Sequence, residues 1–119
     1  MKKILVVDDE PDTVEFLKRG LEKNHFNAIS AQNGEEGLNK AFEDKPDLIL
    51  LDLLMPNKDG FTMLRELKAN VSTKHIPVIV LSVKPESGSI FKGQDYGAID
   101  YIIKPCDLQT ILKYIKRYI

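Results

Sequence analysis

The sequence predicts one α/β domain over residues 1–119, built as a doubly wound (βα)5 unit with helices on both faces of a parallel sheet. Two observations support this class. Short apolar runs rich in branched residues alternate with segments of helical period along the whole chain. Such alternation implies parallel strands joined by crossover helices. The length of 119 residues is that of a single domain.

Five segments have the pattern of β-strands. Three are continuous apolar runs bounded by polar residues or proline, which is typical of strands buried on both faces: Ile4–Val7, Leu48–Leu51 and Val78–Leu81. Two further segments, Asn27–Ala31 and Ile99–Ile103, carry polar residues within the run. That composition indicates strands at the edges of the sheet.

Helical periodicity fills the intervals between these runs. Apolar residues recur at helical spacing in four groups: Val14, Leu17 and Leu21; Leu38, Ala41 and Phe42; Phe61 and Leu64; and Leu108, Ile111, Leu112, Ile115 and Ile119. Another helix is expected near Ser87–Tyr96, although Gly88 and Gly93 each lower the stability of such a helix by about 1 kcal/mol. Pro11 suits a first helical turn, and Asp107 is placed to cap the last helix.

The types of strand also predict their order in the sheet. If the first, third and fourth strands are interior and the second and fifth are edges, the order 2-1-3-4-5 satisfies all five assignments. This is the flavodoxin-like order, in which a ligand crevice lies at the carboxyl ends of the first and third strands, where the winding reverses.

Charged or hydroxyl side chains stand at the carboxyl ends of four strands: Asp8 and Asp9, Asp52, Ser82, and Lys104. Three neighbouring carboxylates repel one another, and Mg²⁺ relieves this repulsion because it is a hard dication that prefers oxygen ligands. With the ammonium of Lys104 included, the charges of such a site sum to zero. The site is suited to receive a phosphoryl group. Asp52 at its centre is the candidate nucleophile, because a carboxylate needs no base to attack phosphorus.

Four motifs together carry a family resemblance. Asp8–Pro11, Asp52–Gly60, Ser82 and Gly97–Pro105, in this order and at this spacing, resemble the CheY-like receiver domain of two-component response regulators. No single motif is decisive, but their joint occurrence is highly specific. The resemblance covers the whole chain, from the first strand to the last helix.

The resemblance implies a role for each residue of the acidic cluster. Asp52 is the expected phosphoacceptor. Asp9 is expected to bind Mg²⁺ directly and Asp8 mainly through water, with a further oxygen from the main-chain carbonyl of Leu54.

It also implies the residues that respond to the phosphoryl group. Ser82 is expected to donate a hydrogen bond to it, and Lys104 to form an ion pair with it. Tyr101 is the expected switch aromatic, which turns inward when Ser82 moves toward the phosphate. The Lys104–Pro105 peptide bond is expected to be cis.

Two positions depart from the family pattern. Val83 stands where alanine or glycine is common after the hydroxyl residue, and Cys106 stands where an aromatic residue often follows the Lys-Pro pair. The lifetime of the phosphoaspartate is therefore left open by the sequence.

The function implied by the resemblance is a phosphorylation switch, and not a turnover enzyme. A sensor histidine kinase or phosphotransfer protein donates the phosphoryl group, and water later removes it. The surface of Ser87–Tyr96, Ile99–Ile103 and the last helix is expected to change and to control a partner or an effector domain, in a monomer or in a dimer formed through this surface.

Two alternative functions fit the sequence less well. An aspartyl-nucleophile phosphatase requires Asp-x-Asp, which Asp52-Leu53-Leu54 lacks. An unphosphorylated interaction module need not keep all the residues of the site.

Composition excludes several other classes. The net charge of -1 gives no reason to expect binding to nucleic acids or anionic membranes. The single cysteine, Cys106, excludes an intrachain disulfide, and no stretch approaches the roughly 20 apolar residues of a membrane helix. By elimination, a cytoplasmic location is expected. Whether the chain acts alone or as the receiver part of a longer protein is left open.

Overall fold

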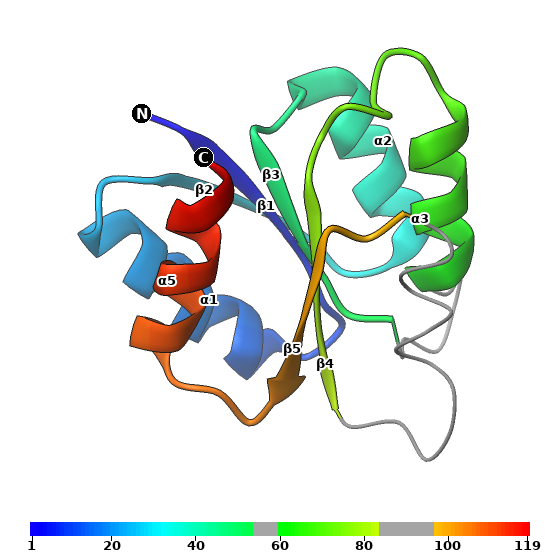
Figure 1. The fold of residues 1–119 in the computed structure, drawn as a ribbon. Coiled ribbons are helices and arrows are strands. Elements are labelled where there is room, and N and C mark those ends of the chain that lie inside the picture. Colours follow the sequence, from blue (N-terminus) through cyan, green and yellow to red (C-terminus); the bar gives the residue numbers. More distant parts are fainter. Residues whose placement is uncertain (54–59, 84–96) are drawn as a thin grey trace.

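The computed structural model describes residues 1–53, 60–83 and 97–119 (Figure 1). The elements follow one another as β1 (Lys3–Val7), α1 (Pro11–Lys23), β2 (Asn27–Ala31), α2 (Gly34–Asp44), β3 (Leu48–Leu51), α3 (Gly60–Ala69), β4 (Val78–Val83), β5 (Asp100–Lys104) and α5 (Leu108–Tyr118). The helix predicted near Ser87–Tyr96 lies outside the described residues. No helix of the described part of the chain is long and apolar enough to cross a membrane.

The five strands form one parallel sheet in the order β2-β1-β3-β4-β5, which confirms the flavodoxin-like order predicted from the strand types. The last two strands extend one or two residues further than the sequence predicted. Ser82 pairs with Ile103, and Val83 pairs with Lys104. The ladder uses backbone groups, so a strand does not end where its apolar side chains end. Ser82 and Lys104 are therefore fixed within strands, and not in the loops that follow them.

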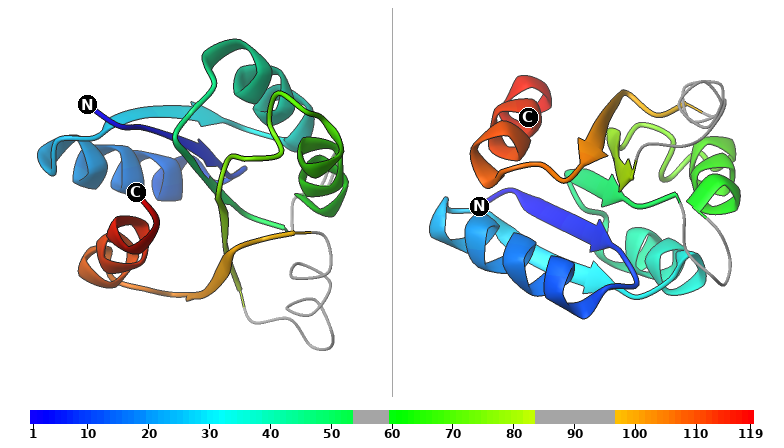
Figure 2. Two further views of the ribbon diagram at one scale, coloured as in Figure 1. Left: turned by 45° about the horizontal axis from the view of Figure 1, so that its top comes forward. Right: turned by 90° about the horizontal axis from the view of Figure 1, so that it is seen from below.

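Apolar side chains cover both faces of the sheet. Since successive residues of a strand point to opposite faces, each strand contributes to two cores. One core lies under α1 and α5, and the other lies under α2 and α3. Figures 1 and 2 show these two pairs of helices on opposite faces of the sheet. Every residue of β3 is buried in one core or the other. The sheet is thus packed on both faces, and its carboxyl edge presents the polar residues.

The helices begin where the sequence supplies suitable residues. Pro11 opens α1, and Asp107 caps α5 by accepting a hydrogen bond of 2.8 Å from the Thr110 N–H. Asn33 caps α2 in the same way, because its side-chain oxygen accepts a hydrogen bond of 2.8 Å from the Glu36 N–H. These caps satisfy backbone donors that have no partner within the helix.

Candidate functional site

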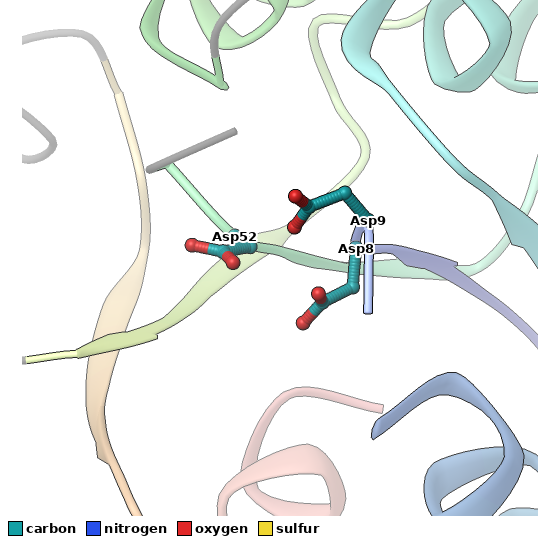
Figure 3. Close-up of side chains that lie close together, drawn as sticks. All are labelled: Asp8, Asp9 and Asp52. Atoms are coloured by element: carbon teal, nitrogen blue, oxygen red, sulfur yellow. The ribbon is translucent and has the colours of Figure 1, made fainter. Parts of the chain in front are cut away.

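Three carboxylates meet at the carboxyl edge of the sheet. Asp8 and Asp9 leave the end of β1, and Asp52 leaves the end of β3 (Figure 3). β1 and β3 are paired with Val7 opposite Leu51, so the residues that follow them are neighbours. One carboxylate oxygen from each aspartate lies within 4.8 Å of the others. The structure therefore brings together the three acidic residues that the sequence placed at this edge.

Two of these carboxylates are removed from solvent. Asp8 is 3% exposed and Asp52 is 6% exposed, whereas Asp9 is exposed. A buried carboxylate is costly unless hydrogen bonds or opposite charges compensate it. The surroundings of Asp8 and Asp52 must therefore supply that compensation.

Lys104 supplies the positive charge. Its Nζ lies 2.6 Å from Oδ2 of Asp8 and 3.4 Å from Oδ2 of Asp52, so the ammonium bridges the two buried acids. Burial alone lowers the pKa of Lys104, but the hydrogen bond to Asp8 and the charges of Asp52 and Asp8 outweigh burial and raise it above its usual value. The Lys104–Pro105 peptide bond is cis. The sequence predicted that Lys104 neutralises the carboxylates and pairs with a phosphoryl group, but it did not indicate that Asp8 is its nearest partner.

Ser82 holds the other oxygen of Asp52. This fully buried hydroxyl donates a hydrogen bond of 2.7 Å to Oδ1 of Asp52. Both oxygens of the central carboxylate are thus engaged, one from β4 and one from β5. Such charge-assisted contacts fix the orientation of the carboxylate at the same time as they offset its burial.

Tyr101 is within electrostatic reach of Asp52. Burial raises the pKa of its phenol, and the negative charge of Asp52 raises it further. The ring packs partly buried against the core under α2 and α3. Tyr101 thus lies close enough to Asp52 for a change of charge there to alter its electrostatic environment.

The acidic cluster fits Mg²⁺. Two oxygens on opposite sides of Mg²⁺ are about 4.2 Å apart, because each lies about 2.1 Å from the ion. The observed limit of 4.8 Å is slightly wider, so the cluster must close a little or leave one acid at the distance of a bridging water. Asp8 suits the outer position, because its Oδ1 accepts the Glu10 N–H at 3.0 Å and its Oδ2 pairs with Lys104. Leu54, the predicted source of a carbonyl ligand, lies outside the described residues.

A shallow hollow of about 300 Å³ adjoins Lys104 between α1 and the start of α5. Phe16, Leu17 and Cys106 are among the side chains that line it. Cys106 is partly buried and packs against the core under α1 and α5, so it behaves as a small apolar residue. The side chain of Val83, the other departure from the family pattern, lies outside what the structure describes.

A parallel sheet of order 2-1-3-4-5, with an acidic cluster, a hydroxyl and a lysine at its switch point, defines a receiver-type α/β domain. The comparison with protein families agrees, because a family model described as the response regulator receiver domain matches residues 4–116. The chain belongs to this family, which confirms the resemblance seen in the sequence.

The relatives differ in how much of their own length the chain covers. Over 115 residues the chain is 39% identical to protein PilH of Pseudomonas aeruginosa, covering 97% of this chain and 95% of PilH. It is 38% identical to the response regulator ArlR of Staphylococcus saprophyticus, covering 98% of this chain but 51% of ArlR. The chain thus spans almost all of one relative and about half of the other.

Solved structures show the same fold. The chemotaxis protein CheY4 of Vibrio cholerae superposes with a TM-score of 0.94 at 27% identity, covering 100% of this chain and 99% of CheY4. A signal receiver domain of a histidine kinase from Syntrophus aciditrophicus gives a TM-score of 0.92 at 34% identity, covering 99% and 89% of the two chains. The fold is therefore that of receivers found in different protein contexts.

Proposed function

We propose that this receiver is a phosphorylation switch, in which Asp52 accepts a phosphoryl group from the phosphohistidine of a sensor histidine kinase or a phosphotransfer protein. A carboxylate oxygen of Asp52 forms the new bond to phosphorus as the P–N bond breaks, and the imidazole keeps the electron pair. The observation that supports this best is the central carboxylate of Asp52, which is 6% exposed and oriented through both oxygens by Ser82 and Lys104. Such fixed orientation favours in-line attack.

Mg²⁺ is the cofactor in this proposal, held directly by Asp9 and Asp52 and through water by Asp8. The carbonyl of Leu54, outside the described residues, completes the proposed ligand set. When bound, the ion neutralises charge on the phosphoryl oxygens and the acids around them. Lys104 would add a second positive charge beside Asp8 and Asp52, and it would pair with the phosphoryl group after transfer.

The proposed output is a change in the surface around β5 and α5, together with the segment predicted as the fourth helix. Ser82 and Tyr101 transmit the change, because Ser82 donates a hydrogen bond to Asp52 and the charge of Asp52 acts on the phenol of Tyr101. A phosphoryl group shifts the switch only through different contacts in its two states, so these residues must meet it differently in each. The surface then contacts a downstream protein or an effector domain, as a monomer or a phosphorylation-dependent dimer.

A cytoplasmic location is part of the proposal, since phosphohistidine donors act there and the only cysteine, Cys106, is a free thiol. The receiver catalyses only its own phosphorylation and dephosphorylation. It is therefore expected to leave a generic phosphate ester unhydrolysed over many turnovers.

The test is incubation with acetyl phosphate and Mg²⁺, followed by intact-mass measurement. The parent should gain one phosphoryl group, EDTA should prevent the gain, and Asp52→Asn should abolish it. Asp12→Asn, which removes an acid in the first turn of α1 outside the cluster, should label like the parent. An unlabelled parent, under conditions that label another receiver, would refute the proposal.

A further inference from the structure

The start of α3 lies unusually close to the backbone that bears Asp52. A methyl group placed on Gly60, the first residue of α3, would lie 2.6 Å from the carbonyl oxygen of Asp52 and 2.5 Å from the Cα of Leu53. Both atoms belong to the main chain, so no side-chain rotation relieves the contact. The Gly60 N–H also donates a hydrogen bond of 3.2 Å to the carbonyl of Leu53.

The other glycines that face buried neighbours approach side chains and not the main chain. A methyl group on Gly20 would lie 2.5 Å from two methyl carbons of Leu108, at the far end of that side chain. On Gly37 it would meet the side chains of Val7 and Met63. Among these three buried positions, Gly60 alone faces backbone atoms.

The structure indicates which side would yield to a side chain at position 60. α3 is anchored by Met63, Leu64 and Leu67, none of which has any exposed surface. Within the sheet β3 is held by β1 on one side and β4 on the other. The Asp52 N–H is still bonded to the Val7 carbonyl at 2.9 Å, but the peptide that joins Asp52 to Leu53 follows this bond, so the displacement falls on the carbonyl side of the residue that carries the central carboxylate. To reach ordinary contact at 3.4 Å, the carbonyl of Asp52 would have to move by about 0.8 Å.

We propose that Gly60 is a positioning residue for Asp52: its missing side chain lets α3 start close enough to hold the Asp52–Leu53 peptide at the spacing the acidic cluster needs. This inference rests on the proposed function, since it concerns the same carboxylate and the same Mg²⁺ site. A shift approaching 1 Å at a reacting group lowers rates by up to about a hundredfold. The same shift would also move Asp52 relative to the acids that follow β1, and these residues together form the proposed Mg²⁺ site.

The experiment compares Gly60→Ala with Gly20→Ala, which adds the same methyl group to a buried helical glycine under the opposite face of the sheet. For each variant, Mg²⁺ affinity is measured by titration of backbone amide NMR shifts. The rate of labelling by acetyl phosphate is measured at saturating Mg²⁺, and the midpoint of urea unfolding is measured in EDTA.

We expect Gly60→Ala to bind Mg²⁺ about tenfold more weakly and to label about ten to a hundred times more slowly, even at saturating Mg²⁺. Gly20→Ala is expected to lose stability and to keep both site properties. If Gly60→Ala loses stability alone, with unchanged affinity and rate, it is only a packing residue and the inference is wrong.

Two further outcomes remain distinguishable. If Gly60→Ala is unfolded even in a stabilising osmolyte, the glycine is required for the fold and the positioning role is refuted. If the parent binds Mg²⁺ but is never labelled, the proposed function fails. The ratio of Mg²⁺ affinities between parent and Gly60→Ala still decides the positioning role.

Discussion

The repulsion within the acidic cluster is measurable through Asp9. At 4.8 Å, two unit charges surrounded by water repel by about 0.9 kcal/mol. Asp9 is exposed, but Asp8 and Asp52 are buried and 4.8 Å is the upper limit of the separations, so this aqueous value is a lower bound for each of the two interactions. The positive charge of Lys104, which pairs with Asp8 and Asp52, offsets part of the combined repulsion that these two acids exert on Asp9. In the absence of divalent ions, Asp9→Asn should therefore raise the free energy of unfolding by about 1 kcal/mol.

The order of stability should reverse when Mg²⁺ is added. Binding to the native state alone adds about 2.7 kcal/mol at a ligand concentration near 100 times Kd. The parent should gain this increment, whereas Asp9→Asn lacks a direct ligand in the proposed site and should gain much less. The variant is thus expected to be the more stable protein in EDTA and the less stable one in saturating Mg²⁺.

Urea unfolding in EDTA and over a series of Mg²⁺ concentrations tests this reversal. Glu10→Gln is the matched control, because it removes the neighbouring negative charge from a residue outside the cluster whose side chain makes no capping hydrogen bond. It should follow the parent. If Asp9→Asn is less stable than the parent in EDTA, repulsion at Asp9 is refuted, and if it gains the same increment from Mg²⁺, Asp9 is not a direct ligand.

Three further predictions concern single residues outside the repulsion at Asp9. Ser82→Ala removes the hydrogen bond to Asp52 and should lower the free energy of unfolding by about 1.5–3 kcal/mol in urea titrations. Lys45→Gly should raise it by about 0.5–1 kcal/mol, because Lys45 ends α2 with a left-handed φ of 45°. The Thr110 N–H lowers the pKa of Asp107, so the carboxylate stabilises α5 above its unfolded pKa and loses this effect as pH falls through the folded value. The Tm gap between parent and Asp107→Ala should therefore be wide at neutral pH and narrow in acid.

Each of these has a clear contrary result. Ser82→Thr keeps the hydroxyl and should stay close to the parent, so equal losses in both variants would exclude the hydrogen bond as the cause. Unchanged or lower stability in Lys45→Gly would show that the left-handed residue is not strained. A Tm gap for Asp107→Ala that does not depend on pH would exclude a contribution from the ionised cap.

The fold was predictable because local composition reports burial. The uninterrupted run Leu48–Leu51 is buried on both faces, and Asn27–Ala31 with its polar residues is an edge strand. The same contrast, applied to all five strands, predicted their order. The ends of β4 and β5 were less predictable, because backbone pairing continues through Ser82 and Lys104, whose side chains carry no apolar signal.

The sequence predicts which residues meet at the site, but it is less informative about which of them are in contact. Topology requires Asp8, Asp9 and Asp52 to meet at one edge. Which acid pairs with Lys104 depends instead on distances of an ångström, and the sequence offers no sign that Asp8 is the nearer partner. Nor does it distinguish Gly60, whose two nearest neighbours are backbone atoms, from glycines that face side chains.

The ion pair between Asp8 and Lys104 has a consequence for how the protein is made. Its partners are 96 positions apart, and every strand pair in the sheet is parallel and therefore non-local. Such pairings form slowly, because long loops must close before any contact compensates for their entropy. During synthesis, Asp8 and Asp52 emerge long before Lys104, so the growing chain cannot neutralise them internally. We expect a receiver halted before β5 to be unable to bury its acids, and the site to be assembled only in the last step of folding.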